Sequence, residues 1–114
     1  MRIKLAYPLR LGEIAEVTNG YVSKCYANKT FYYIATDSRE VFRGDLFIAL
    51  KGENDDGEKY VPYIINKEAF HFSKSKRPEG VRVSDTRTGI LNLANYYKTK
   101  FDNLRYTVAI TGSV

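Results

Sequence analysis

Hydrophobic and polar positions repeat along this chain with two different periods, and each period predicts its own kind of element. Residues 11–18 place apolar side chains at the 3, 4 and 7 spacing of one helical face, which predicts a short helix. The following Asn19-Gly20 pair is typical of the left-handed residue that closes a helix. Residues 46–50 instead form a continuous apolar run, which predicts an interior strand covered on both faces.

Further strands and helices are predicted on both sides of this run. Residues 21–25 and 31–35 are rich in aromatic and β-branched side chains and are separated by a segment that can turn, so we expect a hairpin. The other expected elements are strands at 70–73, 81–83 and 106–110, a helix from about 58 to 68 with Pro62 in its first turn, and a helix that begins at Asp85 or Thr86. Because strands and helices alternate, the predicted fold class is α/β, with a small mixed sheet and flanking helices.

Three features invite a functional interpretation but are expected to be structural. The run Phe31-Tyr32-Tyr33 suits a platform on which nucleic-acid bases stack, yet such a run is more often a strand packed on both faces. Cys25, the single cysteine, falls in an expected strand, where burial is the default. His71, the single histidine, alternates with two phenylalanines and is expected on a strand surface rather than in a catalytic site.

Composition and charge narrow the class of protein. The 114 residues are 44% hydrophobic, enough for the core of one domain or of one domain plus part of another. No apolar run approaches the ~20 residues of a membrane-spanning helix, and the first residues lack the apolar region of a secretory signal, so the expected location is the cytoplasm. The net charge of +5 favours an anionic partner. Basic residues gather only at Lys74, Lys76, Arg77 and Arg82, which we interpret as a solvated loop.

A first polar loop follows the strand expected at 31–35. Ligands in α/β sheets bind beyond the carboxyl ends of strands, so such a loop is a candidate site. Asp37 can brace a turn, while Ser38 offers a hydroxyl and Arg39 a planar cationic fork. These groups suit a diphosphate, where charge and several donors must converge. They also suit an ordinary Asx turn in which Arg39 pairs with a carboxylate, and both interpretations stay open.

A second polar loop, residues 51–57, follows the apolar run and contains no apolar side chain. Gly52 and Gly57 permit the close approach of a ligand to the backbone. Lys51 is placed to meet a phosphate, and the Asn54 amide can hydrogen-bond a base edge because it both donates and accepts. A mobile, solvated loop is the alternative that the residues leave open.

The last residues, Thr111-Gly112-Ser113, follow an expected strand and look like the first half of a phosphate-binding turn. A complete turn needs a later Gly-Lys-[Ser/Thr], whose lysine reaches the β- and γ-phosphates. We therefore expect the chain to be part of a longer protein and not to hold ATP tightly by itself. No metal site is predicted, because the Asp55-Asp56 pair has no further ligand at a suitable spacing.

Four segments together resemble the N-terminal part of the Mur ligase family. They are Leu-Gly-Glu-Ile-Ala at 11–15, Thr-Asp-Ser-Arg-Glu-Val at 36–41, Gly-Asp-Leu-Phe-Ile-Ala-Leu-Lys-Gly-Glu-Asn at 44–54 with Asp-Gly at 56–57, and Val-Ala-Ile-Thr-Gly-Ser at 108–113. The third segment is the most specific, and the similarity extends over almost the whole chain. The Thr-Gly-Ser ending favours the family members that add D-alanyl-D-alanine over siblings that usually have Thr-Gly-Thr there.

The resemblance implies a three-domain enzyme of peptidoglycan precursor synthesis. It implies that ATP and Mg²⁺ drive amide formation through an acyl phosphate, and that D-alanyl-D-alanine is joined to a UDP-N-acetylmuramoyl-tripeptide. The N-terminal domain would hold the UDP end of the substrate, the central domain ATP, and the C-terminal domain the incoming amino acid or dipeptide. By motif position, Ser38 and Arg39 would lie near the diphosphate. The uridine side would be lined by Lys51, Gly52, Glu53, Asn54, Asp56 and Gly57, and the ATP site would begin with Thr111, Gly112 and Ser113.

The same resemblance divides the chain into a UDP-substrate-binding domain, residues 1–84, and the helix and first strand of an ATP-binding domain, residues 85–114. The ATP-site lysine, the magnesium ligands and the acyl-phosphate residues would lie beyond Val114. We therefore expect this chain alone to be catalytically inert and to bind no cofactor. Glu58 stands where the family often has histidine, and residues 67–70 replace a common Gly-Ala pattern, so no contact is carried over to position 58.

Other functions remain open at this point. The chain also fits a Mur ligase that adds an amino acid to a UDP-muramoyl-dipeptide, a non-catalytic module that binds nucleotide sugars, or a small basic RNA-binding domain that uses its tyrosines and phenylalanines. RNA binding would depend steeply on salt. The ligase interpretation predicts saturable binding of UDP, little affinity for nucleic acid, no membrane partner and a monomer.

Overall fold

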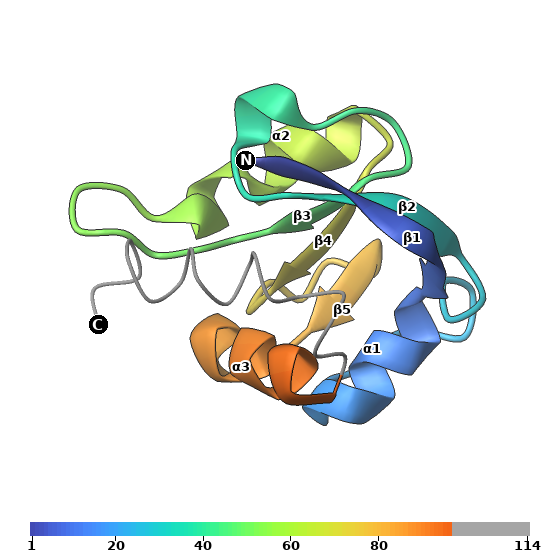
Figure 1. Ribbon diagram of the computed structural model, residues 1–114. Helices are drawn as coiled ribbons and strands as arrows, with labels where there is room; N and C mark the ends of the chain where they lie inside the picture. Colours follow the sequence, from blue (N-terminus) through green and yellow to red (C-terminus); the bar gives the residue numbers. More distant parts are fainter. Residues whose placement is uncertain (97–114) are drawn as a thin grey trace.

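The computed structural model describes residues 1–96, which build a five-stranded sheet with helices on both faces (Figure 1). The strands are β1 (Arg2–Arg10), β2 (Thr30–Ala35), β3 (Leu46–Ile48), β4 (Phe70–Ser73) and β5 (Gly80–Arg82). The helices are α1 (Leu11–Thr18), α2 (Val61–Asn66) and α3 (Thr86–Tyr96), with the short 3₁₀ helices η1 (Ser38–Glu40) and η2 (Gly57–Tyr60). The predicted α/β class is confirmed. Within residues 1–96, no helix has the length and apolar character needed to cross a membrane.

The order of the strands brings three loops to one edge of the sheet. The strands lie in the order β1-β2-β3-β4-β5; β1 is antiparallel to β2, and all other neighbours are parallel. The carboxyl ends of β2, β3 and β4 therefore point the same way, and the segments that follow them, residues 36–39, 49–57 and 74–79, leave the sheet at the same edge. The sheet is mixed, as the sequence predicted.

The apolar run of β3 is buried on both faces because its side chains alternate between two hydrophobic clusters. Leu46 and Ile48 lie in the cluster beneath α1 and α3, whereas Phe47 and Ala49 lie in the cluster beneath α2. Figure 1 shows α2 on one face of the sheet and α1 and α3 on the other. The predicted interior strand is confirmed, and it supplies a rigid base for the loop that follows it.

Helix α3 shares the core of the strands. Its buried residues Ile90, Leu93 and Ala94 belong to the same hydrophobic cluster as the residues of α1 and β1. The Asp85 carboxylate caps the helix by accepting hydrogen bonds from the backbone N–H groups of Arg87 and Thr88, at 3.0 and 3.4 Å. The domain boundary near residue 84 stays a prediction, and the strand expected at 106–110 lies outside the described residues.

The predicted hairpin is wrong. Residues 21–25 form no strand: Tyr21 makes one isolated bridge to Arg82, and Cys25 lies exposed in a turn instead of buried. The antiparallel partner of β2 is β1, which the sequence pattern did not reveal. A bulge between Lys4 and Leu9 interrupts the pairing and leaves only two fully buried side chains in nine residues, so the period-2 signal is lost.

Two aromatic positions also differ from expectation. Phe31 is buried, but Tyr32 is 55% exposed, so the first half of β2 is covered on one face only. His71 was expected on a strand surface and is instead completely buried. The reason is that β4 lies between β3 and β5 with helices over both faces, a neighbourhood that the local alternation Phe-His-Phe does not reveal.

Candidate functional site

The two polar loops identified in the sequence meet beyond the carboxyl ends of β2 and β3. Residues 36–39 line one wall of a cleft of about 640 Å³, and Gly52, Asp55 and Gly57 line the facing wall. We call this the β2–β3 cleft. The loops are separated along the chain by β3, yet the parallel pairing of β2 and β3 places them side by side. Ser38, Arg39, Gly52 and Gly57, four of the predicted site residues, therefore share one cavity.

The first wall is a turn closed by its own ion pair. Asp37 Oδ1 accepts hydrogen bonds from the Arg39 backbone N–H at 2.9 Å and from Arg39 Nε at 3.0 Å, and Oδ2 accepts from Nη2 at 2.8 Å. These bonds from Arg39 lower the pKa of Asp37 from 3.8 to about 2. This geometry is the Asx turn with a paired arginine that the sequence left open. A guanidinium carries five N–H donors, so the pair does not exhaust the donors of Arg39.

The backbone of this wall is fixed from below by α2. Lys67 Nζ donates to the carbonyl oxygens of Ser38 and Val41, at 3.4 and 3.1 Å, and lies 4.8 Å from the centre of the Tyr63 ring. Ser38 is buried, while the Arg39 side chain is 86% exposed. The turn thus presents the long, exposed, cationic side chain of Arg39 from a backbone that hydrogen bonds hold in place.

Gly57 sets the shape of the second wall by packing directly on the end of β3. Its N–H donates to the Leu50 carbonyl at 2.8 Å. A Cβ atom on Gly57 would lie 2.8 Å from the Leu50 oxygen and 2.9 Å from the Leu50 nitrogen, closer than backbone atoms tolerate. A Cβ on Gly52 would meet only the Asp55 carbonyl, at 3.6 Å. Of these two glycines, Gly57 is the one that the packing requires.

Two carboxylates of the second loop bind residues of η2, the 3₁₀ helix that follows it. Asp56 accepts from the Glu58 backbone N–H at 3.0 Å and so caps η2. Asp55 pairs with Lys59 Nζ at 2.6 Å and accepts from the Tyr60 hydroxyl at 3.0 Å. The hydrogen bond from Lys59, followed by that from Tyr60, lowers the pKa of Asp55. The loop is thus a hydrogen-bonded structure with a defined shape.

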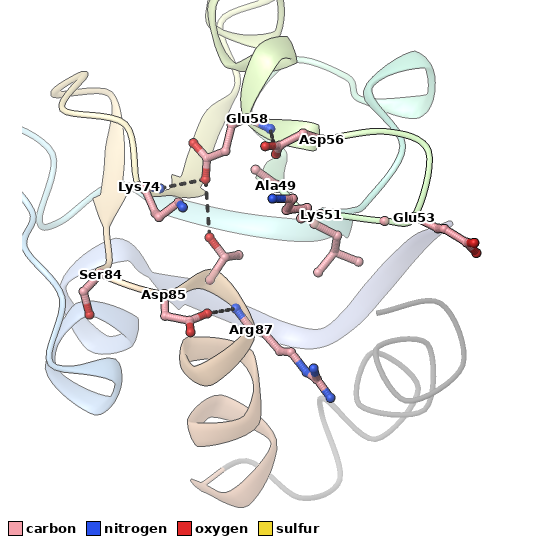
Figure 2. Close-up of a pocket in the computed structure, with 12 residues that line it drawn as sticks. Ala49, Lys51, Glu53, Asp56, Glu58, Lys74, Ser84, Asp85 and Arg87 are labelled. Carbon is pink, nitrogen blue, oxygen red and sulfur yellow. Dashed lines mark hydrogen bonds between the residues drawn. The ribbon is translucent and has the colours of Figure 1, made fainter. Parts of the chain in front are cut away.

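A second cavity, of about 450 Å³, lies between the 51–57 loop and the start of α3 (Figure 2). We call it the loop–α3 cavity; it shares Leu50 and Gly52 with the β2–β3 cleft. The predicted site residues Lys51, Glu53 and Asp56 line this cavity and not the cleft. Asn54 is exposed and lines neither. The structure therefore divides the predicted site between two adjacent cavities.

Glu58 joins three elements at the loop–α3 cavity. Its Oε2 atom accepts from the Lys74 backbone N–H at 2.9 Å and from the Thr86 hydroxyl at 3.5 Å, which links η2 to the loop after β4 and to α3 (Figure 2). Sequence analysis set position 58 aside and also missed Lys74, Asp85, Thr86 and Arg87 as lining residues. The sequence signal for Glu58 is its position directly after the Asp56-Gly57 pair.

Opposite charges are mixed in both cavities. The loop–α3 cavity has the cations Lys51, Lys74 and Arg87 beside the carboxylates Glu53, Asp56, Glu58 and Asp85. The β2–β3 cleft has Arg39 beside Asp37 and Asp55. Such walls can hydrogen-bond a ligand that carries both donors and acceptors, as a nucleotide base does, but they attract an anion only through individual side chains.

Sequence comparison connects this arrangement to known enzymes, although no protein-family model matches the chain. The chain is 31% identical over 88 residues to the UDP-N-acetylmuramoyl-tripeptide–D-alanyl-D-alanine ligase of Synechocystis, a match that covers 71% of this chain and 19% of that protein. It is 32% identical over 82 residues to the UDP-N-acetylmuramoyl-L-alanyl-D-glutamate–2,6-diaminopimelate ligase of Clostridioides difficile, covering 68% of this chain and 17% of that protein.

Comparison of the fold with solved structures also finds a ligase of this kind. The UDP-N-acetylmuramoylalanyl-D-glutamyl-2,6-diaminopimelate–D-alanyl-D-alanyl ligase of Acinetobacter baumannii matches with a TM-score of 0.70 and 27% identity, over 85% of this chain and 23% of that one. The relatives and structural neighbours of this chain are Mur ligases. The resemblance seen in the sequence is thus confirmed. The chain spans about a fifth of the length of the curated Mur ligases that it matches.

The individual site assignments made by resemblance to Mur ligases remain predictions. For the UDP side, the structure gives the positions of the eight residues concerned, in and beside two cavities, without assigning a role to any of them. Thr111, Gly112 and Ser113, predicted to begin an ATP site, lie outside the described residues.

Proposed function

We propose that this chain recognises the UDP end of a UDP-N-acetylmuramoyl-tripeptide for an ATP-dependent ligase that adds D-alanyl-D-alanine in peptidoglycan precursor synthesis. The observation that carries the proposal is the β2–β3 cleft, where residues 36–39 and 51–57 face each other. The choice of substrate is supported by the names of the Synechocystis relative and of the Acinetobacter baumannii structures.

In this proposal, each of the two cavities binds a different end of UDP. In the β2–β3 cleft, the Ser38 hydroxyl and the donors of Arg39 not used by Asp37 bind the diphosphate through charge-assisted hydrogen bonds. In the adjoining loop–α3 cavity, Lys51, Gly52, Glu53 and Asp56 line the uridine side, together with Gly57 from the cleft and the exposed Asn54 of the same loop. Gly52 lies at the junction of the two cavities, where the nucleoside joins the diphosphate.

The mixed charge of these walls has a consequence for binding. Because Arg39 lies beside Asp37 and Asp55, few counterions are released when an anionic ligand binds. Binding of UDP is therefore expected to depend weakly on salt. A single strand of RNA held by basic side chains would show the opposite behaviour.

Catalysis belongs to the rest of the proposed ligase. ATP with Mg²⁺ would supply the phosphoryl group that activates the substrate carboxylate, and residues 1–84 contribute substrate binding only. We propose that residues 85–114 begin the ATP-binding domain and that the chain works as a cytoplasmic monomer. Purified chain is then expected to show neither ligase nor ATPase turnover, measured by phosphate release.

Isothermal titration calorimetry on the full chain tests the proposal. We expect saturable 1:1 binding of UDP-N-acetylmuramoyl-tripeptide, with most of the affinity retained by UDP alone. Tighter binding of the UDP-muramoyl-dipeptide would move the proposal to a ligase that adds an amino acid. Steeply salt-dependent binding of single-stranded RNA, without binding of UDP, would contradict the proposal.

A further inference from the structure

A third, smaller cavity collects most of the basic cluster that the proposed function leaves unused. Lys76 and Arg77 from the loop after β4, and Arg82 from β5, line a cavity of about 210 Å³ whose other wall includes Tyr21 and Ser23. We call it the β5 cavity. It shares no lining residue with the β2–β3 cleft or the loop–α3 cavity.

The charge of the β5 cavity differs from that of the other two. None of its lining residues is acidic. Arg77 pairs with Glu79 through Nε and Nη2, at 3.1 and 3.0 Å, an interaction that fixes the guanidinium and lowers the pKa of Glu79. Among residues 1–96, no carboxylate lies within ion-pair distance of Lys76 or Arg82. A net positive potential therefore remains at the cavity.

A buried histidine holds the loop that carries these cations. His71 Nε2 lies 2.7 Å from the Arg77 carbonyl oxygen, and His71 Nδ1 lies 2.7 Å from the Ser73 hydroxyl. A carbonyl oxygen can only accept, so Nε2 carries the proton and Nδ1 of the neutral ring accepts from Ser73. Ser73 Oγ in turn accepts from the Ser75 N–H at 3.1 Å, and Ser75 Oγ accepts from the Arg77 N–H at 3.1 Å. The loop backbone is thus preorganised.

The opposite wall is equally fixed and contains an unsatisfied polar atom. The backbones of Tyr21 and Arg82 exchange two hydrogen bonds, of 2.8 and 2.9 Å, and the Ser23 carbonyl accepts from the N–H groups of Tyr26 and Ala27. The Ser23 hydroxyl oxygen is buried without a hydrogen-bond partner within residues 1–96. Buried hydroxyls are costly unless they are paired, so this unpaired oxygen is an unfavourable feature of the wall.

We propose that the β5 cavity binds a phosphate group, with Lys76, Arg77 and Arg82 supplying positive charge. The cavity is smaller than the ~300–1,000 Å³ of sites that enclose a whole small molecule, so it accommodates the phosphate and leaves the rest of the ligand in solvent. Arginine suits this role because its planar donors match phosphate oxygens. The site is separate from the proposed UDP site.

Titration of the ¹⁵N-labelled full chain with inorganic phosphate, followed by amide chemical shifts, tests this proposal. We expect saturating shifts at Ser23, Gly80 and Arg82. Arg82→Gln is expected to weaken binding by about tenfold, the effect of losing a charge-assisted hydrogen bond. Arg43→Gln is the matched control, because Arg43 is exposed, pairs with Glu68 and lies outside the cavity. Equal weakening by both variants, or shifts that do not saturate, would overturn the proposal.

Two further experiments identify the kind of ligand that carries the phosphate and test whether this site is independent of the UDP site. Binding of free glycerol phosphate assigns the site to a small molecule, whereas binding only of phosphatidylglycerol vesicles assigns it to a lipid headgroup; binding of neither overturns the proposal. Arg82→Gln is expected to leave the affinity for UDP unchanged. A loss of UDP binding in Arg82→Gln would contradict the separation of the sites, while Arg39→Ala should affect UDP alone.

Discussion

The loops after β3 and β4 leave the same edge of the sheet but are held in place by opposite means. The 51–57 loop is fixed through side chains and packing of its own residues: Gly57 packs on Ala49 and Leu50, just after β3, and Asp55 and Asp56 bind residues of η2. The 74–79 loop is fixed from beneath by buried His71, and its cations face outward. In the two proposals, the first loop would recognise a ligand through its shape, and the second would present charge from a rigid backbone.

The largest expected effect comes from removing the close packing of the 51–57 loop. Gly57→Ala forces a Cβ atom against the Leu50 backbone, so we expect it to lower the free energy of unfolding by about 1–3 kcal/mol and to abolish UDP binding. Gly52→Ala is the matched control and should stay within about 0.5 kcal/mol. Urea denaturation measures both. Equal destabilisation by the two variants would show that Gly57 has no special place in this loop.

A smaller effect is expected from the facing wall of the cleft. Arg39→Ala removes the cationic donors proposed for the diphosphate, so UDP binding should weaken by about tenfold in calorimetry. The fold should persist, because the Arg39 side chain is exposed. Arg43→Ala serves as the control at another exposed arginine. An unchanged affinity in Arg39→Ala would place the diphosphate elsewhere.

The histidine that holds the 74–79 loop should make stability depend on pH. Burial lowers the pKa of His71 below its ordinary 6.5, so the unfolded chain binds this proton more readily than the folded one. The free energy of unfolding should therefore fall as the pH drops from 6.5 towards the lower pKa of the folded state. His71→Gln can keep a donor towards Arg77 but cannot titrate, and it should abolish this dependence. Because the chain has a single histidine, a dependence that survives in His71→Gln would contradict the assignment.

The smallest expected effect is the difference in how the ligand affinities of the two loops depend on salt concentration. Raising the salt concentration from about 50 to about 200 mM should weaken phosphate binding at the β5 cavity several-fold and change UDP binding much less. The difference follows from three cations without a lining carboxylate in one cavity and mixed charges in the other. Calorimetric titrations with phosphate and with UDP at each salt concentration measure the two affinities. An equal dependence of both affinities on salt would contradict the claim that charge dominates binding at the β5 cavity only.

The elements that could be predicted from the sequence are those whose burial repeats regularly. Helix α1 was predicted because its buried residues recur at each turn, and strand β3 because all its residues are apolar and buried in one or other of the two clusters. Strand β1 was missed because its bulge leaves only Leu5 and Leu9 buried. The burial of His71 was missed because it depends on neighbouring strands that the local pattern does not specify.

The candidate site was predictable to a similar degree. Each polar loop was identified because it follows an expected strand and ligands in α/β sheets bind beyond the carboxyl ends of strands, and the structure brings residues of both loops into one cleft. The role of Glu58 was not predictable, since its partners Lys74 and Thr86 lie 16 and 28 residues further along the chain. The division of the site between two cavities depends on α3 in the same way, because α3 supplies the far wall of one of them.

Amide chemical-shift mapping of the ¹⁵N-labelled chain during a UDP titration tests the central claim most directly. If the β2–β3 cleft and the adjoining loop–α3 cavity together hold UDP, the amides of residues 36–39 and 51–57 should shift together and yield one dissociation constant, while those of Ser23 and Arg82 stay unchanged. Shifts confined to one of the two loops, or found only around the β5 cavity, would contradict the claim that the two loops together bind UDP.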